Sequence, residues 1–390
     1  MIEVWRKLRA EDPVHWHPET ASQPGFWVIT RYADISQVLR DDQHFTSEKG
    51  NVLATLLEGS DMGGGRMMAV ADGQYHTSLR RLLLEAFSPR ALAGVRRHVR
   101  QLTKRLMLES IERGKCDFAQ DVASVIPLET ICDLLNVPTD DRQEVFQLTK
   151  SALASDYESP EAHADRTARS AIIIYFQDLV TARRENPGDD PISLMATGEV
   201  DGRRLDDLDI VLNCYSLILG GDETSRLAMI GAVRAFIQHP DQWAALKNGE
   251  SPTEVAGEEV LRWTTPAMHF GRTAIADVRL GDRHIRSGDL VTLWLISGNR
   301  DQTVFQSPDL FDIARSPNKH LTMGYGRHFC LGAYLGRIEI YAMLDGLRTF
   351  VRSIQQTGPE RRIYSNFLSG MSSLPVAIEG ESDSLSHWKE

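Results

Sequence analysis

Apolar residues recur at helical spacing along most of the 390-residue chain. Where they stand three and four positions apart, they line one face of an amphipathic or buried helix. Shorter apolar runs bounded by turn pairs such as Gly281-Asp282 and Ser287-Gly288 are typical of strands. The pattern predicts a mainly α fold with a small β region, with helices over 79–93, 95–111, 166–184, 205–237, 252–263 and 331–350, and strands over 25–29, 272–276, 278–280 and 290–296.

No repeat of fixed period and no Pro/Gly/Ser-rich linker divides this pattern, so we expect residues 1–390 to form a single domain. One segment, 299–326, is irregular and rich in Pro, Asp, Asn and Gly. So long an irregular stretch is unusual inside a compact domain unless it has a structural or functional task. We therefore expect this segment to position the residues on its C-terminal side.

Charge and cysteine content narrow the class of protein. The formal charge of -11 argues against broad nucleic-acid binding, which needs a basic surface. The N-terminus is charged from Glu3 onward and lacks the apolar core of a secretion signal or membrane anchor. The four cysteines, Cys116, Cys132, Cys214 and Cys330, form no CxxC pair and no zinc spacing, which is typical of a reducing compartment. We expect a cytoplasmic protein without a membrane anchor.

The segment Met323-Gly-Tyr-Gly-Arg-His-Phe-Cys330-Leu-Gly-Ala leads directly into a predicted helix. Free backbone amides and the positive end of a helix dipole would lower the pKa of a thiol there and make its sulfur a good metal ligand. Gly326 and Gly332 would let the backbone approach a flat cofactor closely. A lone cysteine without these neighbours is more often a buried, inert residue.

Two adjacent glycines, Gly220 and Gly221, interrupt the longest predicted helix just before Asp-Glu-Thr224. Each costs a helix about 1 kcal/mol relative to alanine. The missing side chains would leave room for a flat ligand and a small molecule such as dioxygen, and Thr224 can donate back to the carbonyl of Gly220. The alternative is a helix break or a tight helix crossing, with Thr224 as an ordinary cap.

Together these two segments resemble the cytochrome P450 family. The cysteine loop is similar to the family's haem-binding signature, Phe-Gly-x-Gly-x-His-x-Cys-Leu-Gly, with Met323 in the place of the phenylalanine. The glycine segment is similar to its oxygen-binding helix. The resemblance implies a haem-thiolate monooxygenase that holds one haem b through Cys330 as metal ligand. It assigns proton delivery to Thr224 and Glu223, and it implies dioxygen and external electrons from NAD(P)H.

Further motifs match in the family's order, and the resemblance covers nearly the whole chain. Glu259-Val-Leu-Arg262 alone would be a surface pair worth a few tenths of a kcal/mol, but the resemblance implies a structural network completed by Arg315. His76 and Arg80 stand four residues apart, and by themselves they would also more commonly be a surface pair. The resemblance implies instead that propionates bind His76, Arg80, Arg272 and His328, and that the cofactor also contacts Gly220, Gly221, Gly324 and Gly332.

The sequence says less about the substrate pocket than about the cofactor site. The resemblance implies walls around 51–68, 214–221, 266–270 and 367–368, and residues 63–65 would make either a gate or a plain surface loop. Arg66 and His269 are candidates for recognising a polar or acidic group, with solvent or the haem as the alternative neighbour. The pocket candidates are Arg66, Leu217, Ala267, His269, Phe367 and Leu368.

The expected reaction is the hydroxylation of a small organic molecule in secondary-metabolite biosynthesis or catabolism. Desaturation, ring closure and coupling are alternatives, and a non-catalytic haem sensor is a more distant one. The start of the chain looks abbreviated for the family, and we expect a monomer.

The chain has no flavin or iron-sulfur segment after the haem region, which implies a separate ferredoxin and ferredoxin reductase. An acidic ferredoxin would suit a locally basic face on the cysteine side. The residues that could form this face are Arg97, Lys104, Arg315, Lys319, Arg327 and Arg337. The alternative is that these residues are a scattered set of solvated charges.

Overall fold

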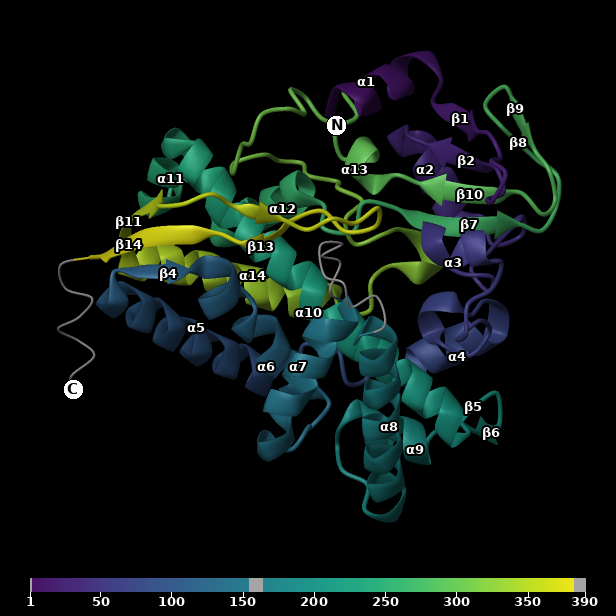
Figure 1. The fold of residues 1–390 in the computed structure, drawn as a ribbon, viewed down its shortest axis with the longest axis horizontal. Helices are drawn as coiled ribbons and strands as arrows, with labels where there is room; N and C mark the ends of the chain where they lie inside the picture. Colours follow the sequence, from purple (N-terminus) through teal and green to yellow (C-terminus); the bar gives the residue numbers. More distant parts are fainter. Residues whose placement is uncertain (1, 154–163, 382–390) are drawn as a thin grey trace.

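The computed structural model describes residues 2–153 and 164–381. Helices make up most of it, and short strands gather at two edges (Figure 1). The mainly α class with a small β region is therefore confirmed. The helices are α1 (Ile2–Glu11), α2 (Tyr32–Arg40), α3 (Leu53–Glu58), α4 (Gly73–Leu84), α5 (Ala93–Arg113), α6 (Val125–Leu134), α7 (Arg142–Leu153), α8 (Ala164–Glu185), α9 (Pro191–Thr197), α10 (Asp207–Gln238), α11 (Pro240–Lys247), α12 (Thr253–Thr264), α13 (Leu295–Gly298) and α14 (Ala333–Phe350).

Helix α10 is 32 residues long and passes through the middle of the molecule (Figure 1). Its N-cap is Asp206, whose side chain accepts a hydrogen bond from the backbone N–H of Asp209 and thereby favours the start of the helix. It packs against α6, α8, α12 and α14. A helix surrounded in this way must be apolar on most sides, which explains its long hydrophobic run.

The larger sheet has the order β1-β2-β10-β7-β3. Strand β10 pairs in parallel with β2, with Leu290 opposite Phe26, and antiparallel with β7. A second, antiparallel sheet has the order β11-β14-β4. The strands are β1 (Val14–His17), β2 (Phe26–Ile29), β3 (Phe45–Thr46), β4 (Lys115–Asp117), β5 (Glu199–Val200), β6 (Arg203–Arg204), β7 (Phe270–Ala274), β8 (Val278–Leu280), β9 (Arg283–Ile285), β10 (Leu290–Leu293), β11 (Val351–Gln356), β12 (Arg361–Arg362), β13 (Met371–Ser373) and β14 (Pro375–Gly380).

Five of the six predicted helices are confirmed to within two residues at each end, as α5, α8, α10, α12 and α14. The prediction of a helix over 79–93 is wrong, because α4 begins at Gly73 and ends at Leu84. Pro89 disfavours helical geometry in the residue before it and breaks the pattern. The strand predicted over 290–296 is too long, since its last two residues belong to α13.

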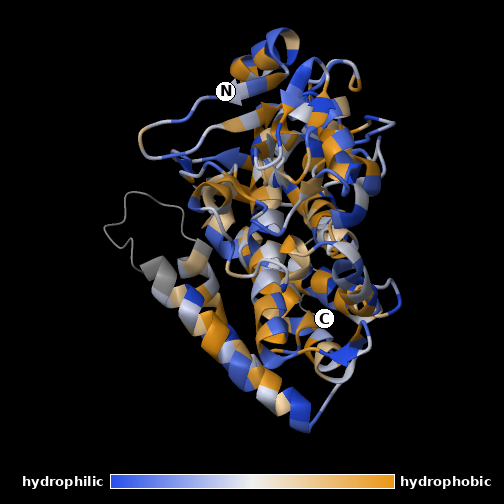
Figure 2. Cartoon of the chain, turned by 90° about the vertical axis from the view of Figure 1, so that its right-hand side faces the viewer, coloured by the Kyte–Doolittle hydropathy of each residue, from blue (hydrophilic) through white to orange (hydrophobic). Residues whose placement is uncertain are grey.

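Polar and apolar positions alternate along the helices, as Figure 2 shows. Helix α6 departs from this rule: seven of its residues are buried, including Pro127 and Thr130. No apolar stripe distinguishes such a helix in the sequence. Among the helices of the described residues, none is long and apolar enough to cross a membrane.

Candidate active site

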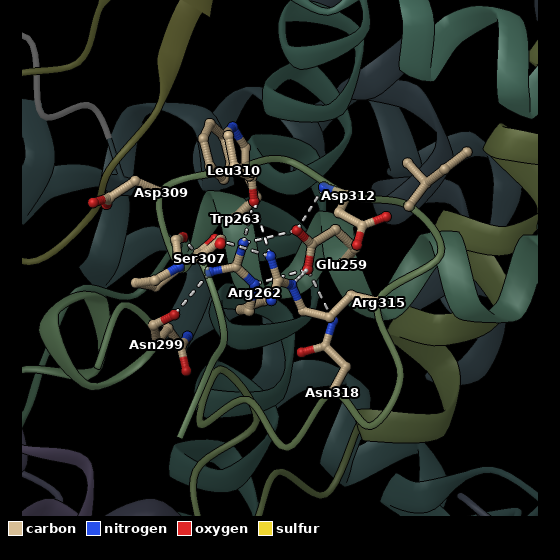
Figure 3. Close-up of polar contacts among 12 residues, drawn as sticks. Glu259, Arg262, Trp263, Asn299, Ser307, Asp309, Leu310, Asp312, Arg315 and Asn318 are labelled. Carbon is tan, nitrogen blue, oxygen red and sulfur yellow. Dashed lines mark hydrogen bonds and ion pairs between the residues drawn. The ribbon is translucent and has the colours of Figure 1, made fainter. Parts of the chain in front are cut away.

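A buried carboxylate organises the irregular segment that precedes the cysteine loop (Figure 3). Glu259 and Arg262, one turn apart on α12, are both 0% exposed. The Arg262 guanidinium donates to both carboxylate oxygens of Glu259, each at 2.7 Å. Arg315 donates to the same carboxylate at 3.1 Å, and so does Asn318 at 3.0 Å. Glu259 thus contacts both arginines, as the resemblance implied, whereas no pattern in the sequence indicated Asn318.

The two arginines also bind the backbone of the irregular segment. Arg262 donates to the carbonyl oxygens of Asn299, Pro308 and Leu310. Arg315 donates to those of Gln306, Ser307 and Leu310. A segment without regular structure must find partners for its buried carbonyls, and these two guanidinium groups supply them. The expectation that this segment has a positioning task agrees with its place, directly before the cysteine loop.

The cysteine loop is closed by a hydrogen bond of 2.8 Å from the Cys330 N–H to the Met323 carbonyl. Gly324 and Gly326 both have a φ of 71°, a conformation that side chains rarely adopt. A Cβ on Gly326 would lie 2.5 Å from the carbonyl oxygen of Leu39 in α2. Close packing on α2, rather than contact with a cofactor, therefore explains Gly326. Gly332 instead faces the sulfur, with its Cβ position 4.0 Å from Sγ.

Cys330 lies deep within the fold, yet its side chain has accessible surface. A side chain with both properties lines an internal space. Burial raises the pKa of Cys330, although the Gly332 N–H, Arg80 and Arg337 oppose it. The predicted lowering of this pKa is therefore wrong for the thiol by itself, because desolvation of the thiolate outweighs the three favourable groups. A metal ion that coordinates the sulfur would still displace the proton.

The glycine turn of α10 has the geometry expected from the sequence at Thr224. Its Oγ1 donates to the Gly220 carbonyl at 3.1 Å. Gly220 is exposed in the middle of α10, and a Cβ added there would meet nothing within 4 Å. The same addition at Gly221 would come within 2.9 Å of Ile131 in α6. Gly220 therefore borders open space, while the contact with Ile131 favours the helix-crossing explanation for Gly221.

Glu223 does not contact Thr224 through its carboxylate. It forms a two-point ion pair with Arg226, one turn further along α10, with 2.8 Å between Nε and Oε2. Both side chains are largely buried. Sequence reasoning missed Arg226, although its spacing of three from an acidic residue is the pattern of a helical ion pair.

Four cationic or imidazole groups converge near the sulfur. The rings of His76 and His328 lie 4.3 Å apart, and Arg80 acts electrostatically on the pKa of both His76 and Cys330. Arg272 and His328 line the same pocket as His76. Burial lowers the pKa of Arg272 to about 10 and, with the nearby His328 and Arg80, that of His76 to about 4.

One carboxylate, that of Asp72, belongs to this cluster and was missed by sequence reasoning. His328 Nε2 lies 2.9 Å from Asp72 Oδ1, and Thr46 and the Ser47 N–H donate to the other oxygen. These bonds overcome the effect of burial and hold the pKa of Asp72 well below its usual range. His76 Nε2 has no hydrogen-bond partner among the described residues. The cluster therefore has capacity for further anionic groups.

These features fit a haem. Its two propionates would supply the anions that the cation cluster lacks, and its iron would need only one protein ligand on the Cys330 side. Among the described residues, no group of three or more His, Cys, Asp or Glu could hold a metal ion by itself.

Two substrate-pocket candidates are engaged elsewhere. Arg66 is paired with Asp209 of α10 at 3.0 Å and with Asp206 at 3.4 Å, so the expectation that it recognises a substrate group is not supported. His269 is 0% exposed, and its Nε2 accepts the Leu53 N–H at 3.0 Å. Burial lowers the pKa of His269 to about 4. A neutral and fully buried ring is a poor receptor for an acidic group, although its Nδ1 has no partner of good geometry among the described residues.

The other pocket candidates are apolar. Ala267 and Leu368 form an isolated antiparallel bridge, and the Met268 N–H donates to the Phe367 carbonyl at 2.8 Å. The structure thus brings together the segments 266–268 and 367–368. Leu217 lies on α10, less than one turn before Gly220, and is partly buried.

The model of the family "Cytochrome P450" matches residues 253–378. Cytochrome P450 NovI of Streptomyces niveus is 48% identical over 378 residues, covering 97% of this chain and 93% of that protein. Linalool 8-monooxygenase of Pseudomonas putida is 31% identical, covering 96% and 95%.

Solved structures resemble the whole chain. P450 OxyD, described as involved in the biosynthesis of vancomycin-type antibiotics, superimposes with a TM-score of 0.89 at 34% identity, covering 97% of this chain and 96% of that one. Mycobacterium marinum cytochrome P450 CYP268A2, solved with pseudoionone, gives a TM-score of 0.88 at 33% identity, with 96% and 94% covered.

Glu259→Gln should lower the free energy of unfolding by about 3–5 kcal/mol, because it leaves two buried guanidinium groups without their carboxylate. Urea unfolding measures this loss. Glu379→Gln is the control, since it breaks an exposed ion pair with Arg352 and should change little. Equal losses in the two variants would contradict the central role of Glu259.

The two glycines of α10 should respond to alanine in opposite directions. Gly220→Ala should raise stability by up to about 1 kcal/mol, because the methyl group meets only open space and alanine favours the helix. Gly221→Ala should lower the thermal unfolding temperature, because the methyl group meets Ile131. Adding Ile131→Val to Gly221→Ala should recover part of that loss. Equal shifts of the unfolding temperature in the two alanine variants would contradict the contact between Gly221 and Ile131.

Proposed function

The chain belongs to the cytochrome P450 family, and we propose that Cys330 binds the iron of its haem. It is a monooxygenase that uses haem, dioxygen and electrons from NAD(P)H to oxidise small organic molecules. The observation that carries the Cys330 assignment is the accessible sulfur deep in the fold, next to a cluster of cations with one carboxylate. His76, Arg80, Arg272 and His328 bind the propionates.

The backbone of the cysteine loop completes the cofactor site. Gly332 has no side chain to cover the sulfur, and its N–H donates to it. Gly324 adopts a left-handed backbone conformation, which a residue with a side chain would disfavour, and we assign it to the backbone that borders the cofactor. When bound, the haem supplies dioxygen binding and activation, with the thiolate ligand donating electron density that favours O–O cleavage.

Protons reach this site along α10. Thr224 is the last donor, because its hydroxyl lies beside the open space at Gly220 and is oriented by the Gly220 carbonyl. Glu223 supplies protons to Thr224 from the adjacent position. Its carboxylate is paired with Arg226 and does not contact Thr224, so water must carry the proton between them.

The substrate is a small, largely apolar organic molecule, and hydroxylation is the reaction. Leu217, Ala267, Phe367 and Leu368 form apolar walls that exclude water from the reacting groups. Arg66 and His269 do not contact the substrate, since each is held by other parts of the chain. The similarity to OxyD, a protein described as involved in antibiotic biosynthesis, supports a place in secondary metabolism.

The electron donor is an acidic ferredoxin, itself reduced by a ferredoxin reductase. A surface hollow of about 490 Å³ is lined by Arg96, Arg97 and Arg100 of α5 and by Tyr334 of α14. Tyr334 is four residues after Cys330, so the hollow lies close to the metal ligand. None of these three arginines has an ion pair within the part of the chain that the structure describes. Their uncompensated charge favours an acidic partner.

Three of the six residues expected to form a basic face are held in ion pairs. The basic face that we propose is therefore smaller and lies on α5. Arg315 is only 9% exposed and is bound to Glu259, and Arg337 is bound to Glu258. Arg327 is paired with Asp42. Arg97 and Lys104 are exposed on α5, and Lys319 is exposed too.

The enzyme works as a monomer in the cytoplasm, where reducing conditions keep its cysteines free.

Thr224→Ala should keep haem and ligand binding but lower product formation by up to about 10²-fold, because the last proton donor is lost. Peroxide released per NAD(P)H consumed should rise. The assay uses a small apolar molecule selected by its shift of the haem spectrum. Thr224→Ser keeps the hydroxyl and should restore most of the coupling. Full coupling in Thr224→Ala would remove this residue from proton delivery.

Arg97→Glu should slow reduction by an acidic ferredoxin roughly tenfold at low ionic strength, because it reverses a charge in the docking hollow. The difference from the unaltered enzyme should shrink as salt screens the charges. Arg105→Glu, on the same helix but outside the hollow, is the matched control. Stopped-flow reduction measures both, and equal effects would place the docking surface elsewhere.

A further inference from the structure

Two carboxyl groups outside the proposed mechanism are buried on the neighbouring helices α10 and α14, and the charge of one acts on the other. Asp222 of α10 is 5% exposed, and Glu339 of α14 is 1% exposed. Oδ1 of Asp222 and both carboxylate oxygens of Glu339 have no hydrogen-bond partner of good geometry among the described residues. Buried polar groups without partners are rare and call for an explanation.

The surroundings of the pair contain little positive charge. The groups that face it are Glu223, Ser225 and Arg226 from α10, and Thr130 and Cys132 from α6. Arg226 is the basic group among them, and its guanidinium is already bound to Glu223. The hydroxyls of Ser225 and Thr130 favour the ionised form of Glu339, but the Thr130 hydroxyl also donates to the Ile126 carbonyl at 2.6 Å.

Two ionised carboxylates are not stable in such a place. Burial, together with the charge of Glu223, raises the pKa of Asp222 to about 7. Burial, together with the charge of Asp222, raises the pKa of Glu339 to about 8. Since the groups interact, their titration belongs to the pair rather than to either residue. Near neutral pH the pair therefore retains at least one proton.

The pair lies between the two segments that build the active site. Asp222 is two residues, or about 200° around an α-helix, from Thr224, so it faces away from the open space at Gly220. On the other side, Gly336 is one turn before Glu339, and its Cβ position lies 3.5 Å from the Ser225 hydroxyl and 3.9 Å from the end of Met323. Met323 begins the cysteine loop. A change of charge at the active site thus acts on the pair through a dry interior.

We propose that Asp222 and Glu339 form one proton-sharing carboxyl pair, which takes up a proton from water when an electron enters the active site. This inference rests on the proposed haem site. The electron comes from the ferredoxin and converts ferric to ferrous iron, while the proton converts one carboxylate of the pair to a carboxylic acid. The added negative charge is neutralised, so the net charge of the interior does not change.

The reduction potential of the haem-loaded enzyme should therefore fall as pH rises from 6 to 9. Asp222→Asn and Glu339→Gln should each flatten this dependence, because an amide cannot take up the proton. Asp178→Asn removes an exposed carboxylate of α8 and should leave the slope unchanged. A dye-coupled redox titration measures all four proteins. A slope that is absent in the unaltered enzyme, or that survives in both amide variants, would overturn the proposal.

Infrared spectroscopy tests the shared proton without any change of redox state. At pH 7 the unaltered protein should show the carbonyl stretch of a protonated carboxylic acid, shifted in deuterium oxide, and this band should fade towards pH 9. Each amide variant should weaken it, and the Asp178 variant should not. If an amide variant does not fold, the pH titration of the unaltered protein still decides. Absence of the band contradicts the pair.

Stability gives an independent test with a defined sign. Because the folded pKa values of both groups are raised, their contribution to stability is complete below the ordinary pKa near 4 and is lost as pH rises through about 7 to 8. The unfolding temperature of Glu339→Gln relative to the unaltered protein should therefore increase from pH 6 to pH 9. Two results separate this inference from the proposed haem site. If the haem-loaded protein shows a thiolate-type spectrum but its reduction potential and stability do not depend on pH as described, only the carboxyl pair is contradicted. If the thiolate-type spectrum is missing, the haem site is contradicted, and the infrared band tests the pair separately.

Discussion

The buried carboxylate of Glu259 is the constraint on which the site depends. It holds Arg262 and Arg315, and these arginines bind the carbonyl oxygens of a long segment without regular structure. Burying three charges costs several kcal/mol each unless every donor and acceptor is matched. Here the carboxylate accepts from two guanidinium groups, an amide and a backbone N–H. The segment can therefore run through the interior and deliver the cysteine loop to the start of α14 in one defined position.

Two opposed requirements meet in the space beside this loop. The sulfur of Cys330 must lie deep enough to exclude water, and burial alone keeps its proton on. A metal ion bound to the sulfur would remove that proton, so thiolate formation would depend on the cofactor. On α10, Gly220 leaves open space for lack of a side chain, and its carbonyl orients the Thr224 hydroxyl. The cluster around His76 and His328, with the cations Arg80 and Arg272, provides capacity for anionic groups. Each element thus contributes one chemical property, and their convergence makes the site.

Motifs with a strong local cause were predictable from the sequence. The Thr224 bond to its own helix and the pairing of Glu259 with Arg262 follow from helical spacing, and the long helices follow from periodicity. Properties set by distant neighbours were not predictable. The packing of Gly221 against Ile131, the capture of His269 by Leu53 and the pairing of Arg66 with Asp209 all join segments far apart in the chain. Helix α6 was not predicted, because a helix that is buried on nearly every side has no apolar stripe in its sequence.

The central claim is that the sulfur of Cys330 is the protein's ligand to a haem iron. The most direct test is the absorption spectrum of the purified, dithionite-reduced protein under carbon monoxide, recorded beside Cys330→Ser. A thiolate ligand predicts a strongly red-shifted Soret band in the unaltered protein and its loss in the variant, because only a thiolate ligand produces that shift. An unshifted haem band in the unaltered protein, or a red-shifted band that survives in Cys330→Ser, would contradict it.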